Sequence, residues 1–268
     1  MDIISQKGSK VTAWLSLVIG NTHWHWAWFN DGCLQEVWHL PHRQTFLDLQ
    51  VRGQFPDVLC DLLDASLEIW AVSVVPSQAK CLDNYSQVQW IQQISLEGTY
   101  PTMGIDRIVS LWGAGQHYGW PVLVIDGGTA LTFTAGAEQC FKGGAILLGL
   151  RSHLQALHDY TAALPVVDLP IKLPPRWATN TPDAIQSGVL YLLLAGIHDF
   201  IEQWQYQYPD TAIVFTGGDG QYLRQLYQVY LTQHSKQQNQ ALNDRTWFDA
   251  NLMFWGIAAY RKEATRAL

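Results

Sequence analysis

Three apolar segments of this chain each run directly into a glycine-containing turn, and this repetition constrains the fold more than any other feature. The segments are LSLVIGNT at 15–22, PVLVIDGGTA at 121–130 and TAIVFTGGDG at 211–220. The first two align at an offset of 108 residues, which pairs Gly20 with Gly128 and Val18 with Asp126. Apolar strands that end in matching glycine turns predict two structurally related halves.

Helical patterns separate these strands. Residues 106–120 begin with an aspartate suited to a helix N-terminus and keep apolar residues at helical spacing. Residues 181–204 open with Thr181 as the expected N-cap and then carry nearly continuous apolar positions, so we expect a largely buried helix. A third helical pattern covers 247–263. Strands alternating with helices predict an α/β protein in two similar lobes.

We expect the boundary between the lobes near residue 115, with an N-terminal lobe at 1–115 and a C-terminal lobe at 116–268. Segment 159–180 contains four prolines and no clean period, which predicts an extended connection. The polar stretch at 234–244 predicts an exposed loop.

Charge and cysteine content restrict the possible partners. The formal net charge is -7, the pI is about 5.6 and no basic run is present, which argues against nucleic acid as the main partner. An anionic ligand must therefore be bound by backbone amides, a helix N-terminus, one or two arginines, or a metal ion. Four scattered cysteines without a CxxC pair fit neither a zinc site nor a disulfide framework.

The same composition predicts a cytoplasmic protein without a membrane partner. The N-terminus lacks the apolar region of a signal peptide, and we find no uninterrupted apolar run of membrane-spanning length. Scattered free cysteines are typical of a reducing compartment.

The strand that follows the first turn alternates tryptophan and histidine. Trp24, Trp26 and Trp28 are expected on one face, and His23 and His25 on the other. An HxH pair can bind metal, but a third ligand is not identifiable nearby, so packing or an oligomer contact is the favoured interpretation.

Two short segments combine carboxylates with glycine or arginine. Asp126, Gly127, Gly128 and Thr129 follow a strand and could hold a cation while their amides face phosphate oxygens, although an ordinary hairpin turn with a surface aspartate has the same pattern. In the GIDR segment, Asp106 could accept a hydroxyl proton and Arg107 could bind an anion. A capping aspartate beside a solvated arginine is the simpler interpretation of GIDR alone.

Two further segments are rich in polar residues or glycine. ATNT at 178–181 lies at the start of the second helix and either binds a polar ligand or only caps the helix. TGGDG at 216–220 permits close backbone approach to a flat ligand or forms a flexible loop. The Walker pattern GxxxxGK[ST] and a helix-opening GxGxxG are both absent from the sequence, which excludes P-loop and Rossmann sites.

Taken in order, these motifs resemble the type III pantothenate kinase family. The resemblance rests on GNT at 20–22, SVVP at 73–76, GIDR at 104–107, VIDGGTA at 124–130, GGAILLGL at 143–150, ATNTPDAIQSG at 178–188 and TGGDG at 216–220. It implies the actin, hexokinase and Hsp70-like ATPase architecture, which is ribonuclease H-like, with the active site in the cleft between two lobes. It also implies ATP-dependent phosphorylation of pantothenate, the first step of coenzyme A biosynthesis, by a cytoplasmic homodimer.

The resemblance implies a role for individual residues. Asp106 would be the catalytic proton acceptor for the primary hydroxyl of pantothenate, and Asp126 would bind a monovalent cation, K⁺ or NH₄⁺, beside Mg-ATP. The implied substrate-binding residues are Tyr100, Gly104, Ile105, Asp106, Arg107 and Thr181. The implied ATP-binding residues are Val18, Ile19, Gly20, Asn21, Thr22, His23, Trp24, His25 and Thr129.

Val18 departs from the family pattern, which carries aspartate at this position in D-x-G-N-T. A valine keeps the strand but can neither accept a hydrogen bond nor bind an ion. We favour a working kinase that is slow or demanding in its cations. The alternatives are a non-catalytic regulatory relative of the same fold and a kinase for another small hydroxylated metabolite.

Overall fold

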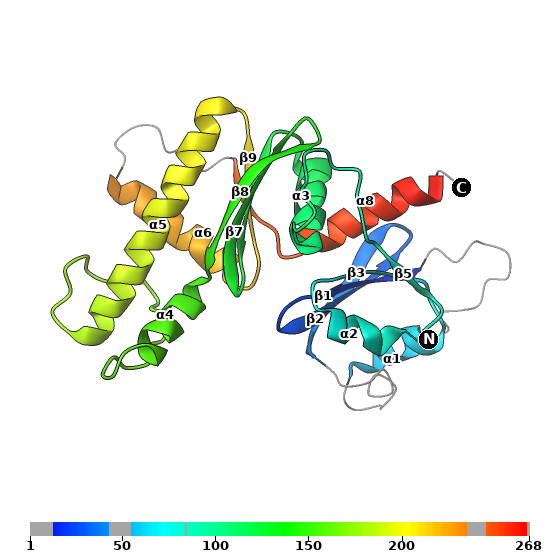
Figure 1. Cartoon of the computed structure of the whole chain (residues 1–268), viewed down its shortest axis with the longest axis horizontal. Helices are drawn as coiled ribbons and strands as arrows, with labels where there is room; N and C mark the ends of the chain where they lie inside the picture. Colours follow the sequence, from blue (N-terminus) through cyan, green and yellow to red (C-terminus); the bar gives the residue numbers. More distant parts are fainter. Residues whose placement is uncertain (1–12, 43–54, 84, 235–244, 267–268) are drawn as a thin grey trace. The chain divides into compact units, whose positions relative to one another are not determined.

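The structure is a computed structural model and describes residues 13–42, 55–83, 85–234 and 245–266 (Figure 1). The chain divides into two compact units. Unit 1 consists of Met1–Ser95, Thr102–Val109 and Met253–Leu268, and unit 2 of Leu96–Pro101 and Ser110–Leu252. Because the C-terminal helix returns to unit 1, this division differs from a single cut at residue 115.

Unit 1 is built on a five-stranded sheet with the order β3-β2-β1-β4-β5. Its strands are β1 (Trp14–Ile19), β2 (His23–Asn30), β3 (Cys33–Pro41), β4 (Ile69–Ser73) and β5 (Val88–Trp90). The first three strands are antiparallel neighbours, and β4 and β5 continue the sheet in parallel with β1. Every residue of β1 is buried, as expected for the central strand of a sheet that is covered on both faces.

Helices cover both faces of this sheet. They are α1 (Asp57–Asp64), α2 (Pro76–Ala79), the short 3₁₀ helix η2 (Lys80–Leu82) and α8 (Leu252–Arg266). Trp24 and Trp26 are fully buried in one hydrophobic core with Leu59 of α1. The opposite face packs on α8, where Phe29 meets the Trp255 ring with centroids 6.0 Å apart. The predicted alternation of the two faces of β2 is therefore confirmed.

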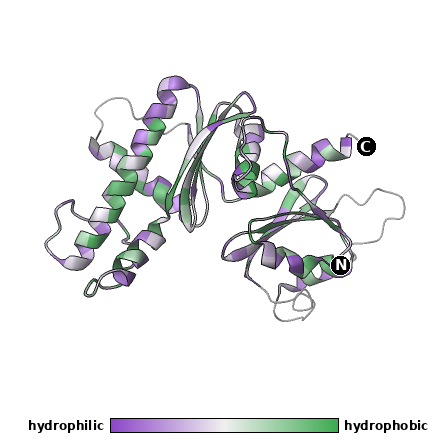
Figure 2. Ribbon diagram, viewed as in Figure 1, coloured by the Kyte–Doolittle hydropathy of each residue, from purple (hydrophilic) through white to green (hydrophobic). Residues whose placement is uncertain are grey.

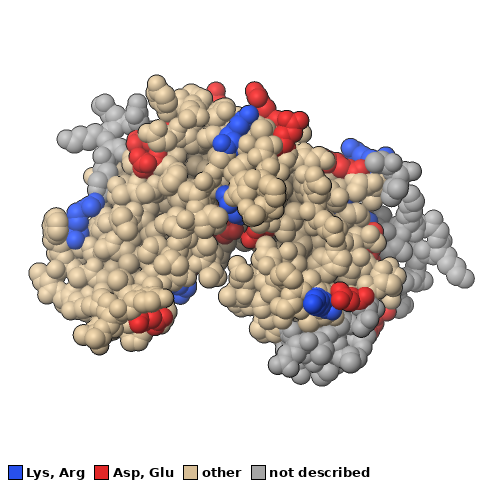
Figure 3. Space-filling model, viewed as in Figure 1, with Lys and Arg blue, Asp and Glu red and all other residues tan. Residues whose placement is uncertain are grey.

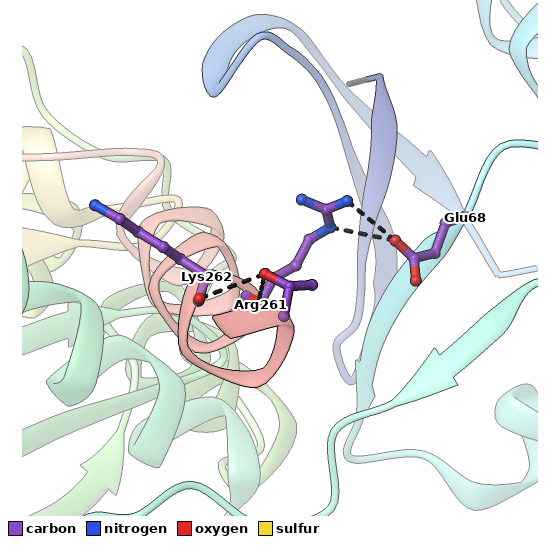
Figure 4. A network of polar contacts seen from close by, with 4 residues as sticks. Glu68, Arg261 and Lys262 are labelled. Atoms are coloured by element: carbon purple, nitrogen blue, oxygen red, sulfur yellow. Dashed lines mark hydrogen bonds and ion pairs between the residues drawn. The ribbon is translucent and has the colours of Figure 1, made fainter. Parts of the chain in front are cut away.

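An ion pair joins α8 to the start of β4. The Arg261 guanidinium donates to Glu68 Oε2 from both Nε and Nη2, at 3.3 and 3.1 Å (Figure 4). The same guanidinium lies 4.9 Å from the centroid of the Trp14 ring. The C-terminal helix is thus bound to the first strand and to the loop that leads into the fourth.

Unit 2 contains a second five-stranded sheet with the order β10-β9-β6-β7-β8. Its strands are β6 (Val122–Gly127), β7 (Ala130–Ala137), β8 (Cys140–Leu148), β9 (Ala212–Thr216) and β10 (Thr246–Phe248). Again three antiparallel neighbours, β6, β7 and β8, are followed by two strands added in parallel. The shared strand order confirms the prediction of two related halves, and the two mixed sheets confirm the α/β fold class.

The helices of unit 2 are α4 (Leu150–Asp159), α5 (Thr181–Gln207), α6 (Gly220–His234) and most of α3 (Ile105–Tyr118). Figure 1 shows α5 and α6 on one face of this sheet and α3 on the other. One core joins α4, α5 and α6 to the sheet through residues such as Leu154, Ile197 and Tyr227.

The observed boundaries of the helices agree only in part with those predicted from the sequence. Asn180, not Thr181, caps α5, because the Asn180 side chain accepts a hydrogen bond from the Asp183 N–H at 3.0 Å. Trp247 and Phe248 belong to β10, since parallel pairing with β9 outweighs the helical pattern there. Residues 160–180 contain neither helix nor strand, which confirms the extended connection. Beyond His234, which ends α6, the predicted polar loop lies outside the described residues.

The prediction that α5 is largely buried is wrong. One side of the helix lies in the core, whereas Leu192 is 67% exposed. Phe200 is 41% exposed even though its ring stacks on Phe133 of the core, with centroids 4.2 Å apart. Hydrophobic residues continue along most of the helix (Figure 2). By length and composition α5 could cross a membrane, contrary to our reading of the sequence, but its buried side forms the core of unit 2.

Candidate functional site

The first glycine turn connects β1 to β2 through Gly20, Asn21 and Thr22. It closes with a hydrogen bond of 3.0 Å from the Gly20 N–H to the His23 carbonyl. Asn21 and Thr22 are exposed, so their backbone and side chains are accessible to a ligand. The structure therefore has the predicted strand-turn-strand unit, whose amides are of the kind that bind phosphate.

Val18 lies two residues before this turn and is 1% exposed. It is paired across the sheet with His25 of β2 on one side and with Val72 of β4 on the other. The position is thus an apolar, buried place in the central strand, directly beside an imidazole.

The second glycine turn connects β6 to β7 through Gly128 and Thr129. It closes with a hydrogen bond of 3.0 Å from the Gly128 N–H to the Ala130 carbonyl. The side chain of Asp126 is partly exposed one residue before the end of β6. Thr129 is exposed at the tip of the turn. A carboxylate and a hydroxyl therefore flank the backbone amides of this turn, as the sequence predicts.

Gly149 supports the second turn from the start of α4. Its N–H donates to the Thr129 carbonyl at 2.9 Å, and a Cβ at this position would collide with the Gly128 carbonyl oxygen. Ser152 Oγ donates to the same Thr129 carbonyl, also at 2.9 Å. Two hydrogen bonds therefore hold the Thr129 carbonyl, and with it the second turn, in place.

The TGGDG segment supports this turn from another side. Gly217 has a φ of 82°, and a Cβ there would collide with the Asp126 carboxylate. The Asp219 N–H donates to the Gly127 carbonyl at 2.8 Å. The Asp219 carboxylate, 8% exposed, accepts from Arg151 Nε at 2.9 Å. TGGDG is therefore a packed support of the second turn and not a free loop.

The GIDR segment begins α3. The Gly104 carbonyl accepts hydrogen bonds from the N–H groups of Arg107 and Ile108, at 3.1 and 3.2 Å. Asp106 Oδ1 accepts the Arg107 N–H at 2.8 Å, so the carboxylate does cap the helix start, as in the simpler interpretation. The Arg107 residue, however, is only 8% exposed and is not a solvated surface arginine.

Burial raises the pKa of the Asp106 carboxyl, against the opposing effects of the Arg107 N–H and guanidinium. A more basic carboxylate accepts a proton more readily. The buried carboxylate at this helix start thus has the properties that a general base needs.

The remaining substrate residues of the prediction lie in unit 2. The Tyr100 side chain is 42% exposed and its ring lies 5.9 Å from that of Phe141. Thr181, exposed at the first residue of α5, lines a groove of about 750 Å³. The groove also has an apolar wall that includes Leu157 and Leu192.

Four histidines gather at the first turn. Two of them contact it directly: His42 Nε2 lies 2.8 Å from the Gly20 carbonyl, and His23 Nδ1 lies 3.0 Å from Thr22 Oγ1. His25 and His39 approach each other with their Nδ1 atoms 2.7 Å apart. Among the described residues, no group of three or more histidine, cysteine or acidic side chains has the geometry to hold a metal ion.

Burial, together with the neighbouring imidazoles of His39, His23 and His42, lowers the pKa of His25 from 6.5 to about 4. At pH values between about 4 and 6.5, His25 binds a proton in the unfolded chain but not in the folded chain. We therefore expect the free energy of unfolding to be highest above pH 6.5 and to fall as the pH drops from 6.5 toward 4. The expected loss is on the order of 2 kcal/mol after allowance for partial exposure.

Urea unfolding at several pH values measures this loss. His25→Gln removes the titrating group and should flatten the profile, whereas His117→Gln, at an exposed histidine near the end of α3, should keep the slope of the parent protein. An identical slope in parent and His25→Gln would contradict the assignment.

Several supporting residues were missed in the sequence. Gly149 is the penultimate residue of GGAILLGL, and Arg151 directly follows this motif, which enters the prediction only as part of the family pattern. His39 and His42 had no neighbouring signal at all, because only cross-strand pairing brings β3 beside β2. On the face that Figure 3 shows, the described lysines and arginines stand singly, in keeping with the absence of a basic patch from the sequence.

Comparison with known proteins identifies the family of the chain. The family model described as Type III pantothenate kinase matches residues 14–203. A type III pantothenate kinase of a Synechococcus species is 41% identical over 218 residues, which cover 80% of this chain and 83% of that protein. Another from a Nostoc species is 38% identical over 276 residues, covering 95% and 97%.

Two solved structures share the fold at low sequence identity. A Campylobacter jejuni protein described as a Baf family transcriptional activator aligns with a TM-score of 0.62 at 22% identity, over 94% of this chain and 99% of that one. A Sinorhizobium meliloti protein described as a 2-dehydro-3-deoxygalactonokinase aligns with a TM-score of 0.54 at 12% identity, over 95% and 96%. These structures confirm the predicted architecture alone, whereas the family match and the relatives above show that the chain belongs to the type III pantothenate kinase family.

Proposed function

We propose that the chain transfers the γ-phosphoryl group of ATP to the primary hydroxyl of pantothenate, the first step of coenzyme A biosynthesis. The observation that carries the proposal is the carboxylate of Asp106. It stands at the start of α3 in a GIDR segment, beside the buried Arg107, with a pKa raised by burial. Membership of the type III pantothenate kinase family supplies the substrate.

Asp106 acts as the general base. It accepts the hydroxyl proton of pantothenate while that oxygen forms a bond to the γ-phosphorus, and the bond from this phosphorus to the bridging oxygen breaks. ADP leaves with the electron pair. Phosphoryl transfer needs little covalent participation by the protein, so one positioned carboxylate is sufficient.

The other substrate residues position pantothenate. Gly104, Ile105 and Arg107 form the binding segment, and the Arg107 guanidinium contributes positive charge that attracts the pantothenate carboxylate. Tyr100 and Thr181 are further contacts. Their exposure leaves both side chains accessible to a small ligand.

The glycine turns bind the phosphates. The first turn, from Val18 to His25, offers the exposed residues Asn21 and Thr22, and the second offers the exposed Thr129. Asp126 is the residue that would hold a monovalent cation, K⁺ or NH₄⁺, since its carboxylate is partly exposed beside the second turn. Together with Mg²⁺, such an ion would supply positive charge that neutralises the phosphate oxygens.

A second copy of the chain covers exposed apolar side chains of unit 2. Leu192 and Phe200 of α5 are 67% and 41% exposed. Ile146 and Leu148 of β8, 62% and 51% exposed, point to the other face of the sheet, because Ala145 and Leu147 pack against the core. Exposed apolar residues are typical of protein interfaces, and on this ground we infer a homodimer. The acidic net charge and the free cysteines support a cytoplasmic protein without a membrane or nucleic-acid partner.

A coupled assay of the purified protein with pantothenate and ATP tests the proposal. We expect ADP production that depends on pantothenate and is several-fold faster in potassium than in sodium. ATP binding without turnover at saturating Mg²⁺ and K⁺ would instead favour a regulatory relative. Turnover only with another hydroxylated metabolite would favour a kinase of different specificity.

A further inference from the structure

A row of side chains crosses three strands of unit 1 beside the first turn. Val18 of β1 is paired with His25 of β2, and His25 is paired with His39 of β3. Because directly paired residues point to the same face of a sheet, the three side chains lie next to one another. The row ends in two imidazoles whose rings meet edge to face, with centroids 4.9 Å apart.

These imidazoles are close to the glycine that opens the turn. A Cβ added to Gly20 would lie 3.4 Å from His25 Nε2. The carbonyl oxygen of the same glycine lies 2.8 Å from His42 Nε2. His23, His25, His39 and His42 together form a histidine cluster at the first turn. His23 and His39 are exposed and His25 is half-buried, so solvent and small ligands reach this cluster.

The cluster lacks a negative partner in the part of the chain that the structure describes. The titratable groups that act on His25 are His39 of β3, His23 of its own strand and His42 after β3. The neighbouring strands β1 and β4 contribute Val18 and Val72 at this level, and neither carries charge. Burial and the other imidazoles therefore keep the pKa of His25 low, and that of His39 is lowered by burial and His23.

The hydrogen bond between the two rings determines where a further proton can bind. In the neutral pair one Nδ1 donates its proton to the other, which leaves the donor ring with a bare Nε2. A proton from solvent can add to that Nε2 without breaking the bond between the rings. The pair then carries one positive charge and presents two Nε2–H donors, which suits a phosphate oxygen.

We propose that His25 and His39 bind the phosphates of the nucleotide at the first turn and take up a proton as the nucleotide binds. This inference rests on the proposed function, because it adds His39 and the uptake of a proton to the same nucleotide site. The anion supplies the negative charge that the cluster lacks and so favours the protonated pair. At Val18 the chain has no carboxylate that could hold a metal ion there, and the imidazole pair contributes positive charge directly.

Calorimetric titration of the full-length protein with ATP, without pantothenate, tests the inference. Titrations near pH 6.5 in two buffers of different ionisation enthalpy give the number of protons taken up per ATP. We expect the parent protein to take up more protons than His39→Gln or His25→Gln, by about half to one proton per ATP. ATP itself gains or loses protons in this pH range, and it does so equally with every variant. The result is therefore the difference in proton uptake between the parent protein and each variant.

His39→Gln is the main variant, because His39 is exposed and glutamine can still hydrogen-bond to His25. The control is His117→Gln, outside the cluster, which should match the parent in proton uptake. Over pH 7.5 to 6.0, ATP affinity of the parent should rise more steeply than that of His39→Gln, by up to about tenfold per pH unit.

The outcomes separate this inference from the proposed function. Equal proton uptake in parent and both variants overturns the inference and leaves the kinase assignment intact. Proton-coupled ATP binding without phosphorylation of pantothenate overturns the kinase assignment and supports the inference. A parent protein that does not bind ATP overturns both.

Discussion

Asp106→Asn is expected to lower the rate of pantothenate phosphorylation at least about a hundredfold while ATP binding changes little. Asparagine keeps an Oδ1 that can accept the Arg107 N–H, so the first turn of α3 stays capped. What it removes is the ability to accept a proton, which the buried and therefore more basic carboxyl provides. Steady-state kinetics and ATP titration of the two proteins measure the effect.

The control for this variant is Asp57→Asn. Asp57 is an exposed aspartate in the first turn of another helix, α1, so its replacement removes a similar interaction with a helix N-terminus. We expect the control to retain the parent activity. If Asp106→Asn stays within a few-fold of the parent, Asp106 is not the base.

Gly217→Ala is expected to destabilise the protein by about 2–4 kcal/mol and to weaken its activation by potassium. A side chain is disfavoured at a φ of 82°, and its Cβ would meet the Asp126 carboxylate and the backbone of Gly127. Relief of that collision must move Asp126, the residue proposed to hold the monovalent cation. Urea unfolding and the potassium dependence of the rate measure the two effects.

Gly218→Ala is a matched control at the next position. A Cβ on Gly218 meets no heavy atom within 4 Å, so this change should cost less than about 1 kcal/mol and leave the potassium dependence as it is. If Gly217→Ala weakens stability but leaves potassium activation unchanged, the cation is not held by Asp126.

The central strands and turns could be predicted from the sequence because their signals are local. An apolar run that ends in Gly20 or Gly128 specifies a strand and a turn without reference to the rest of the chain. The offset between these two turns also predicted related halves, and the matching strand orders agree with it. The family pattern also predicts a catalytic carboxylate in GIDR, and the predicted helix start at this segment agrees with α3.

The supports of the turns could not be predicted because they depend on contacts between distant segments. Gly149 and Gly217 approach the second turn from the starts of two other helices, and their role is visible only in the packed chain. His39 reaches His25 through strand pairing, which a pattern along one strand does not reveal. The cap of α5 was missed for a smaller reason, since asparagine and threonine both suit that position.

Helix α8 has a consequence for how the protein is made. It follows every other described element, yet it covers one face of the sheet that contains β1, and Arg261 reaches Trp14 near the first described residues. A ribosome that synthesises the chain from its N-terminus releases α8 after the strands of both sheets. One apolar side of the first sheet therefore stays uncovered until α8 has emerged. Loss of α8, by a premature stop codon or by a protease, would damage a sheet whose strands lie far away in the sequence.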